Sequence, residues 1–143
     1  MKILSVNAGS SSLKFTLFDM PEEKELISGV FERIGIENSF YTIKLNGEKI
    51  KKETELKDHK AAFELLVKEL IDNKIVDSLD EIAGIGHRIV QGGSYFDKTV
   101  LATEDNISIV EKLSSLAPLH NPAAVVGIRA AQSVFPNATQ TLV

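Results

Sequence analysis

The chain has 143 residues, of which 43% are hydrophobic and 25% charged, a balance typical of one globular domain or one lobe of a larger protein. Its formal net charge of −4 argues against a nucleic-acid-binding scaffold, in which a basic field is expected. The absence of cysteine excludes disulfides and thiolate metal sites and fits a cytoplasmic location, and neither a signal peptide nor an apolar run long enough to span a membrane is present.

The N-terminal half predicts a series of antiparallel strands. Three segments are candidates for strands: Lys2–Asn7, Ser12–Asp19 and Leu26–Arg33. The second has a two-residue period, because Leu13, Phe15 and Leu17 alternate with the residues between them. Two further segments, Phe40–Leu45 and Glu48–Thr54, flank Asn46-Gly47, which is the strongest short signal for a hairpin. The many charges of this hairpin predict an exposed ribbon rather than a binding patch.

The turn between the first two strands is the most informative stretch. It reads Asn7-Ala8-Gly9-Ser10-Ser11-Ser12-Leu13-Lys14 and combines a flexible glycine, three hydroxyls, a carboxamide and a lysine. Such groups suit the phosphates of a nucleotide, although the spacing is not that of a P-loop. Strand alternation predicts that Ser12 and Lys14 share a face, which Ser10 can join, while the apolar residues between them enter the core. The alternative is an ordinary hairpin turn, because glycine and serine are common in turns.

A helix and a buried strand are predicted next. Residues 58–73 carry one apolar stripe, and Asp58 is a suitable N-cap. The strand Glu81–Gly86 runs into His87-Arg88-Ile89-Val90-Gln91-Gly92-Gly93. Ligands of open α/β sheets gather at such strand ends, and the fork of Arg88 matches a carboxylate or a phosphate. The alternative is that Arg88 makes a structural ion pair.

The histidines of this part of the chain predict structural or surface roles. His87, beside Arg88, is expected to be a hydrogen-bonded structural residue. His59 lies in a charged helix start and is expected on the surface.

The last third predicts two helices joined by a rigid connector. The first spans Ile107–Leu116, with Asp105 or Asn106 as its cap, and the second opens at Asn121-Pro122. His120, in the connector, could donate to a phosphoryl oxygen or cap the neighbouring backbone.

The end of the chain completes the prediction of the fold. The helix that opens at Asn121 runs to about Val134 and is apolar nearly all round, as is typical of a helix buried on several sides. Residues 139–143 look like the approach to a strand that is not completed. An antiparallel start followed by α/β crossovers predicts an α/β fold with a mixed β-sheet and flanking helices.

Three segments together resemble the acetate kinase family. Asn7–Phe15 is similar to its N-terminal signature, Gly86–Gly93 to its second motif, and Leu116–Pro122 to a third block. The similarity covers essentially the whole chain, and Ala8 and Leu13 favour the acetate/propionate branch over the butyrate kinases. The resemblance implies one lobe of the sugar-kinase/heat-shock-protein/actin (ribonuclease H-like) two-domain fold, with a cleft between the domains.

The resemblance also implies a reaction and roles for single residues. The reaction is the reversible transfer of the γ-phosphoryl of ATP to acetate or propionate, which gives an acyl phosphate and ADP with Mg²⁺ present. The implied roles are Asn7 near the magnesium, Ser10, Ser12 and Lys14 at the nucleotide phosphates, Arg88 on the carboxylate and the phosphoryl group, Val90 and Leu119 around the substrate methyl, and His120 near the phosphoryl group. These groups are suited to phosphoryl transfer, which relies on positioning and on neutralising charge.

Two departures from the family pattern bear on this expectation. Gln91 stands where the family usually has a histidine. The family also continues past this region into a strand bearing Phe-Asp-Thr-Ala-Phe-His, which holds the catalytic aspartate, and into a second domain with another arginine and the adenosine site. We therefore expect residues 1–143 to be the N-terminal domain of a two-domain acyl kinase that is a homodimer, and to be inactive alone because the C-terminal nucleotide domain is absent. The alternative is a stand-alone, non-catalytic binding or interaction module of the same fold.

Overall fold

The structure, a computed structural model, describes residues 1–88, 100–103, 106–108 and 121–142. The labelled elements, in chain order, are β1 (Lys2–Ala8), β2 (Ser12–Asp19), β3 (Lys24–Glu32), β4 (Phe40–Leu45), β5 (Glu48–Glu53), α1 (His59–Asp72), the 3-10 helix η1 (Leu79–Glu81), β6 (Ile82–His87), β7 (Val100–Leu101), α3 (Asn121–Val134) and β8 (Thr139–Leu142). Residues 106–108 are also helical.

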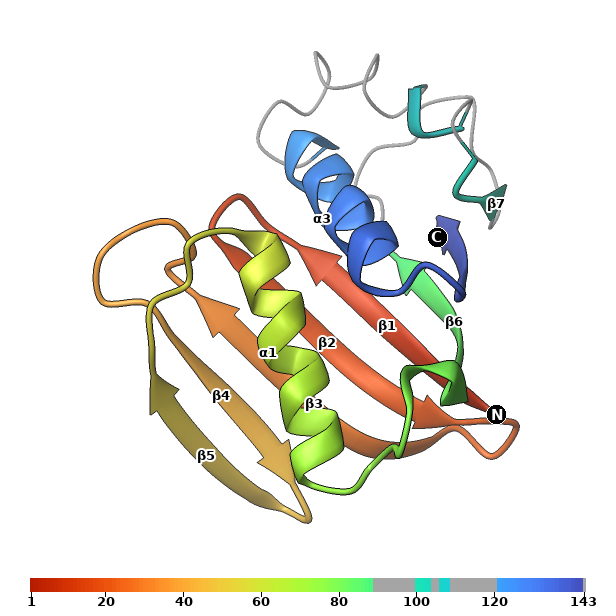
Figure 1. The fold of residues 1–143 in the computed structure, drawn as a ribbon, viewed down its shortest axis with the longest axis horizontal. Coiled ribbons are helices and arrows are strands. Elements are labelled where there is room, and N and C mark those ends of the chain that lie inside the picture. The colour runs from red at the N-terminus through yellow and green to blue at the C-terminus, as the bar shows by residue number, and fades with distance from the viewer. Residues whose placement is uncertain (89–99, 104–105, 109–120, 143) are drawn as a thin grey trace.

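The described strands form one mixed sheet in the order β5-β4-β3-β2-β1-β6-β8-β7 (Figure 1). Strands β1 to β5 pair with one another antiparallel, as a series of hairpins. Strand β6 lies parallel to β1, and β8 lies parallel to β6. The short strand β7 then pairs antiparallel with β8. The predicted mixed sheet with flanking helices is confirmed.

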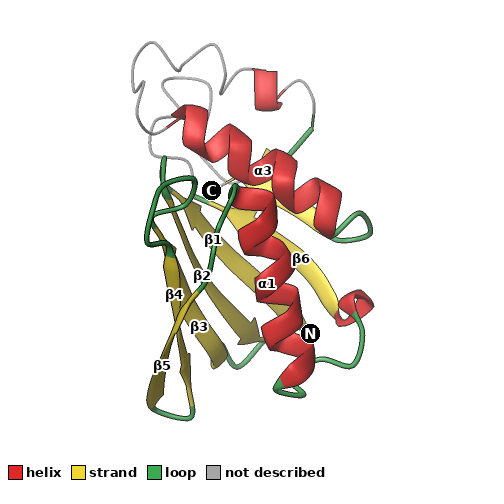
Figure 2. Cartoon of the chain, turned by 60° about the vertical axis from the view of Figure 1, so that its left-hand side comes forward, coloured by secondary structure: helices red, strands yellow, loops and turns green. Residues whose placement is uncertain are grey.

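Helices α1 and α3 cover the same face of the sheet (Figures 1 and 2). Alternate residues of the central strands point beneath them, and the core joins these to apolar residues of both helices: Leu4, Val6, Leu13, Phe15 and Leu17 from the strands, with Ala62, Phe63, Leu66, Leu70 and Ala131 from the helices. Burying one such leucine or phenylalanine contributes about 1.5–3 kcal/mol. The residues between them in each strand lie on the opposite face, which is called here the open face.

Helix α1 forms where its apolar stripe and its cap predict it. The side chain of Asp58 accepts a hydrogen bond from the backbone N–H of Ala61 at 2.8 Å, as an N-cap does. At the other end, Asn73 caps the last turn through its backbone N–H. The helix therefore begins and ends within a residue of the predicted bounds.

Helix α3 packs closely on the end of β1. A Cβ built at Gly127 would lie 2.7 Å from the Cβ of Ala8, so only glycine allows this approach. Ile128 and Ala131 are fully buried, as the apolar sequence predicts, whereas Val126 is 48% exposed. One side of this helix therefore stays outside the core.

Two details of the sequence prediction are wrong. Residues 139–142 do form a strand, β8, because β6 offers them a parallel edge to pair with. Asn106 is not a cap, because it is itself helical and its backbone N–H donates to the hydroxyl of Thr103 at 3.2 Å. Asp105 and most of the predicted helix Ile107–Leu116 lie outside the described residues.

The hairpin β4–β5 is tied to α1 through a buried carboxylate. Glu69 accepts hydrogen bonds from the hydroxyl of Tyr41 at 2.9 Å and from Nζ of Lys52 at 2.6 Å. Burial raises the pKa of Glu69, but the hydrogen bonds from Lys52 and Tyr41 outweigh burial and lower it. Burial, together with the bond to Glu69, raises the pKa of Tyr41. Every residue of β5 is exposed at the edge of the sheet, as predicted for this hairpin, whereas Tyr41 and Ile43 of β4 are buried, so the prediction of an exposed ribbon is wrong for β4.

Candidate functional site

The turn between β1 and β2 is tight. Strand β1 ends at Ala8 and β2 begins at Ser12, and the backbone N–H of Gly9 donates to the carbonyl of Ser12 at 2.9 Å. A Cβ at Gly9 would lie 2.4 Å from the hydroxyl oxygen of Ser12. A larger residue at position 9 would therefore require the Ser12 hydroxyl to rotate away from the turn.

Asn7 and Lys14 lie directly opposite each other across the first hairpin. Their neighbours Val6, Leu13 and Phe15 are buried beneath the helices, so both polar side chains belong to the open face. Lys14 is exposed, and Ser12, two residues before it, belongs to the same face. The structure thus has the side-chain alternation that the sequence predicts.

Arg88 follows β6 at the same level of the sheet as Asn7. Its backbone N–H donates to the carbonyl of Val6 at 2.9 Å, one step beyond the pair formed by Val6 and His87. Because Val6 and His87 are both buried on the helix side, the next residue of each strand, Asn7 and Arg88, belongs to the open face.

Three side chains therefore form a row across the neighbouring strands β2, β1 and β6. This Lys14–Asn7–Arg88 row places one cation on each side of a carboxamide. Adjacent strands are about 4.8 Å apart, so the Cα atoms of Lys14 and Arg88 are about 10 Å apart. Side chains as long as these can close that distance around a polyphosphate or a carboxylate.

Arg88 also lines a hollow of about 890 Å³ on the open face. Ser5, Thr139 and Thr141 line the same hollow with their neighbours on β1, β6 and β8. Hydroxyl groups and a guanidinium suit an anion, because all of them can donate hydrogen bonds.

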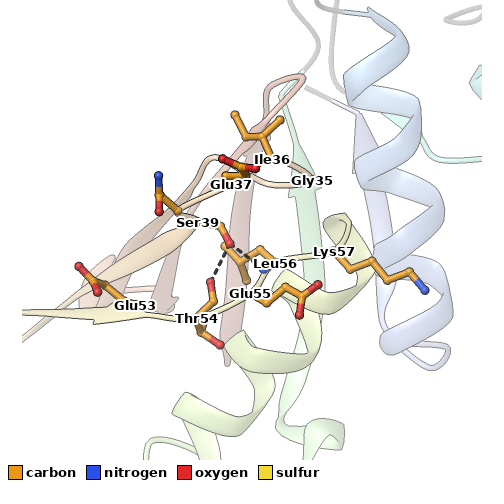
Figure 3. Close-up of a pocket in the computed structure, with 10 residues that line it drawn as sticks. Gly35, Ile36, Glu37, Ser39, Glu53, Thr54, Glu55, Leu56 and Lys57 are labelled. Carbon is orange, nitrogen blue, oxygen red and sulfur yellow. Dashed lines mark hydrogen bonds between the residues drawn. The ribbon is translucent and has the colours of Figure 1, made fainter.

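A second hollow, of about 750 Å³, lies beside the end of β5 and contrasts with the first (Figure 3). Glu37, Glu53 and Glu55 line it together with Lys57. Three carboxylates against one ammonium make it unsuitable for phosphate, so the open face near Arg88 is the better anion site.

His59 is buried, which makes the prediction of a surface histidine wrong. Only 5% of the residue is exposed, and its Nε2 lies 2.8 Å from the carbonyl oxygen of Gly9 and 3.1 Å from that of Ser12. The contact joins residues about fifty positions apart, so no local pattern in the sequence could have found it.

His87 is a buried structural residue, as predicted. Its Nε2–H donates to Oε1 of Gln140 on β8 at 2.7 Å, and the residue is 2% exposed. Burial lowers the pKa of His87, and the bond to Gln140 opposes this only in part. The side chain stabilises the pairing of β6 with β8 and faces away from the Lys14–Asn7–Arg88 row.

Of the other predicted site residues, the structure describes only Ser10. Ser10 is exposed at the tip of the turn, near Ser12. Val90, Leu119 and His120 lie outside the described residues, as does the segment from Gln91 to Gly93. The roles implied for all these residues remain predictions.

The residues of the row can supply part of a magnesium site. Mg²⁺ prefers oxygen ligands and commonly keeps waters and substrate phosphates among them. The carboxamide oxygen of Asn7 fits as one ligand or as an acceptor for a bound water. Within residues 1–88 and the other described segments, no three histidine or acidic side chains gather as a metal centre.

A sequence model described as the acetokinase family matches residues 2–143. An acetate kinase of Bacillus cytotoxicus is 57% identical over 136 residues, which are 95% of this chain and 34% of that protein. In the described parts of the chain, no helix has the length and hydrophobicity needed to cross a membrane.

Solved structures agree with the sequence comparison. The crystal structure of Porphyromonas gingivalis acetate kinase matches with a TM-score of 0.96 and 39% identity, over 99% of this chain and 36% of that one. A propionate kinase from Francisella tularensis matches with a TM-score of 0.91 and 41% identity, again over 99% and 36%. The fold is therefore of the sugar-kinase/heat-shock-protein/actin type, and the chain spans about a third of the length of these relatives.

Proposed function

The chain belongs to the acetokinase family, and we propose that it forms the N-terminal part of an acyl kinase. The reaction is the reversible transfer of the γ-phosphoryl group of ATP to acetate or propionate. The observation that carries this proposal is the Lys14–Asn7–Arg88 row, which gathers two cations and a carboxamide on one open sheet face. The relatives are acetate and propionate kinases, which supports the same chemistry.

The chemistry needs little covalent help from the protein. A carboxylate oxygen of the acyl acceptor forms a bond to the γ-phosphorus while the bond from that phosphorus to the β–γ bridging oxygen breaks, and ADP leaves with the electron pair. Negative charge spreads over the equatorial oxygens during transfer, and fixed donors that face them lower the barrier. Arg88 would hold the acceptor carboxylate and the moving phosphoryl group, while Lys14 would hold the nucleotide phosphates.

The turn would complete the contacts to phosphate. Ser10 and Ser12 offer hydroxyl donors beside Lys14, on the segment that leads into β2. Mg²⁺, when bound with the nucleotide, would neutralise phosphate charge, and Asn7 would be one of its ligands or bind one of its waters. His120 would lie near the phosphoryl group.

The acyl group would be selected by a small apolar pocket that Val90 and Leu119 form. Such a pocket separates substrates by only about 1–3 kcal/mol per methylene. Both acetate and propionate therefore remain within the proposed substrate class.

The remaining parts of the proposal concern the whole protein. We propose that residues 1–143 form one domain of a two-domain enzyme and that additional residues of the same chain form the nucleotide domain. We also propose that the whole enzyme is a homodimer in the cytoplasm. The support is that the matched relatives are about three times as long as the part they share with this chain. The chain alone is then expected to bind phosphate but not to complete a turnover.

Anion binding by the purified 143-residue chain tests the site. Sodium tripolyphosphate is titrated into ¹⁵N-labelled protein, and backbone amide shifts give the dissociation constant. Lys14→Ala and Arg88→Ala should each weaken binding about tenfold, because each removes a charge-assisted hydrogen bond. The matched control is Lys44→Ala, an exposed lysine that belongs to the open face of β4, which should bind as the unaltered chain does. Equal affinities for the unaltered chain and all three variants would contradict the role of the Lys14–Asn7–Arg88 row in binding phosphate.

Product formation tests the division into domains. Acyl phosphate made from ATP and acetate is trapped with hydroxylamine, and the chain alone should give none above background. Robust acyl phosphate would contradict the need for a second domain. If the chain neither makes acyl phosphate nor binds tripolyphosphate, the non-catalytic module of the same fold becomes the better description.

A further inference from the structure

The turn between β1 and β2 is held by two parts of the chain that are distant in sequence. The backbone N–H of Ile34, just past β3, donates to the carbonyl of Ser11 at 2.9 Å. From the other side, Nε2 of His59 lies within hydrogen-bonding distance of the carbonyls of Gly9 and Ser12. The carbonyls of three of its four residues, Gly9, Ser11 and Ser12, therefore have partners outside the turn.

The partners of His59 decide its protonation at Nε2. Both partners are carbonyl oxygens, which can only accept hydrogen bonds. Nε2 must therefore carry the hydrogen and donate to both oxygens in a three-centre bond. If a neutral ring carried its hydrogen only on Nδ1, the lone pair of Nε2 would face the carbonyl oxygens of Gly9 and Ser12 with no hydrogen between them. The fold therefore favours the tautomer with the hydrogen on Nε2.

The position of His59 is itself fixed by the segment that precedes α1. The hydroxyl of Ser39 donates to the carbonyl of Thr54 at 2.7 Å and accepts from the backbone N–H of Leu56 at 2.8 Å (Figure 3). The backbone N–H of Gly35 donates to the carbonyl of Leu56 at 2.6 Å. His59 then follows the N-cap as the first residue of α1.

The imidazole thus connects the start of a packed helix to the turn. Helix α1 is anchored by its buried stripe, which leaves it little freedom to shift against the sheet. The turn carries Ser10 and Ser12 and leads directly into Lys14. A change in the conformation of its carbonyls would move these groups together.

We propose that His59 is a positioning residue that holds the Gly9–Ser12 turn in the conformation needed to bind phosphate. This inference rests on the proposed function of the turn. His59 does not itself touch the phosphate, because the residue is buried and its Nε2–H donates to the two carbonyls. It acts through the backbone of the turn.

The experiment compares His59→Phe, which keeps a ring but loses the donor, with His59→Gln, whose amide can donate from a similar position. Tripolyphosphate affinity is read from amide shifts of the 143-residue chain, and stability from thermal unfolding. His59→Phe should weaken binding about tenfold, as expected for the loss of a hydrogen bond that orders a site, while His59→Gln should recover most of that loss. Leu70→Ala, a core variant at the far end of α1, controls for stability: it should lower the melting temperature without changing affinity.

A spectroscopic measurement tests the hydrogen bond itself. Long-range ¹H–¹⁵N spectra of the imidazole in the unaltered chain should show a hydrogen on Nε2, and a ring with hydrogen only on Nδ1 would overturn the inference. So would equal affinities for the folded His59→Phe variant and the unaltered chain. If the unaltered chain binds no tripolyphosphate, the proposed function of the turn fails, and with it the role of His59 in phosphate binding. The imidazole spectrum then shows whether His59 braces the turn for stability alone.

Discussion

Gly127 provides a sharp test of how α3 packs on β1. An added Cβ at this position would lie 2.7 Å from the Cβ of Ala8, whereas ordinary contact begins at 3.4 Å. Both atoms are fixed to the backbone, so no side-chain rotation can separate them. Gly127→Ala therefore requires α3 to recede by about 0.7 Å, the difference between these two distances.

Two opposing free energies decide the outcome of this substitution. Alanine is favoured over glycine inside a helix by about 1 kcal/mol. Overpacking a close contact costs about 1–3 kcal/mol, since the neighbouring side chains lose contact as the helix moves away. We expect Gly127→Ala to lower the free energy of unfolding by about 1 kcal/mol, the difference between about 2 and about 1.

Urea denaturation measures this free energy, and two variants isolate its cause. Ser133→Ala, at an exposed position of α3, gains only helix propensity and should stabilise the chain by a few tenths of a kcal/mol. Ala8→Gly with Gly127→Ala removes the clash, and the pair should show a favourable coupling of about 1 kcal/mol or more. A single Gly127→Ala variant that is more stable than the unaltered chain, with no coupling to position 8, would refute the described packing.

The remaining predictions concern stability at three buried polar residues. Ser39→Ala should lower the free energy of unfolding by about 2 kcal/mol in urea denaturation, because its hydroxyl serves one backbone donor and one backbone acceptor. An effect below about 0.5 kcal/mol would contradict that role. Tyr41→Phe should cost about 1 kcal/mol in the same assay, since Glu69 loses one of its donors, and an unchanged midpoint would argue against the tether of the hairpin to α1. Burial lowers the pKa of His87, so below its ordinary value of 6.5 the unfolded chain takes up a proton that the folded chain resists. The contribution of His87 to the free energy of unfolding should be fully present above about pH 6.5. It should fall as the pH is lowered through this value toward the pKa of His87 in the folded chain. Thermal unfolding between about pH 7.5 and 5 measures the slope, which His87→Phe should reduce if His87 is its source.

The strands and α1 could be predicted because their signals are local. The two-residue period of β2 and the helical stripe of α1 both follow from one face packing against a common core, and Asn46-Gly47 marks the turn between β4 and β5. The same alternation predicted that Lys14 belongs to the face opposite Leu13 and Phe15. Side-chain direction in a strand needs no knowledge of the partner strand, so this part of the site could be read from the sequence.

What the sequence could not supply depends on distant partners. His59 lies in a charged segment, yet the carbonyls with which its buried ring forms hydrogen bonds belong to a turn about fifty residues earlier. Residues 139–142 carry too short a pattern to predict a strand, and the edge of β6 completes it. That Arg88 lies level with Asn7 depends on the parallel register of β6 with β1, which no single segment encodes.

The charge sequence of β5 has a consequence for association between copies of the chain. Among the described strands, β5 lies at the edge of the sheet, where backbone groups can pair with another β-strand, the usual route by which sheets aggregate. If two copies met antiparallel about the centre of the strand, Glu48 would oppose Glu53 and Lys49 would oppose Lys52. Like charges placed directly opposite each other repel, so the charges of β5 disfavour this pairing between the β5 strands of two copies.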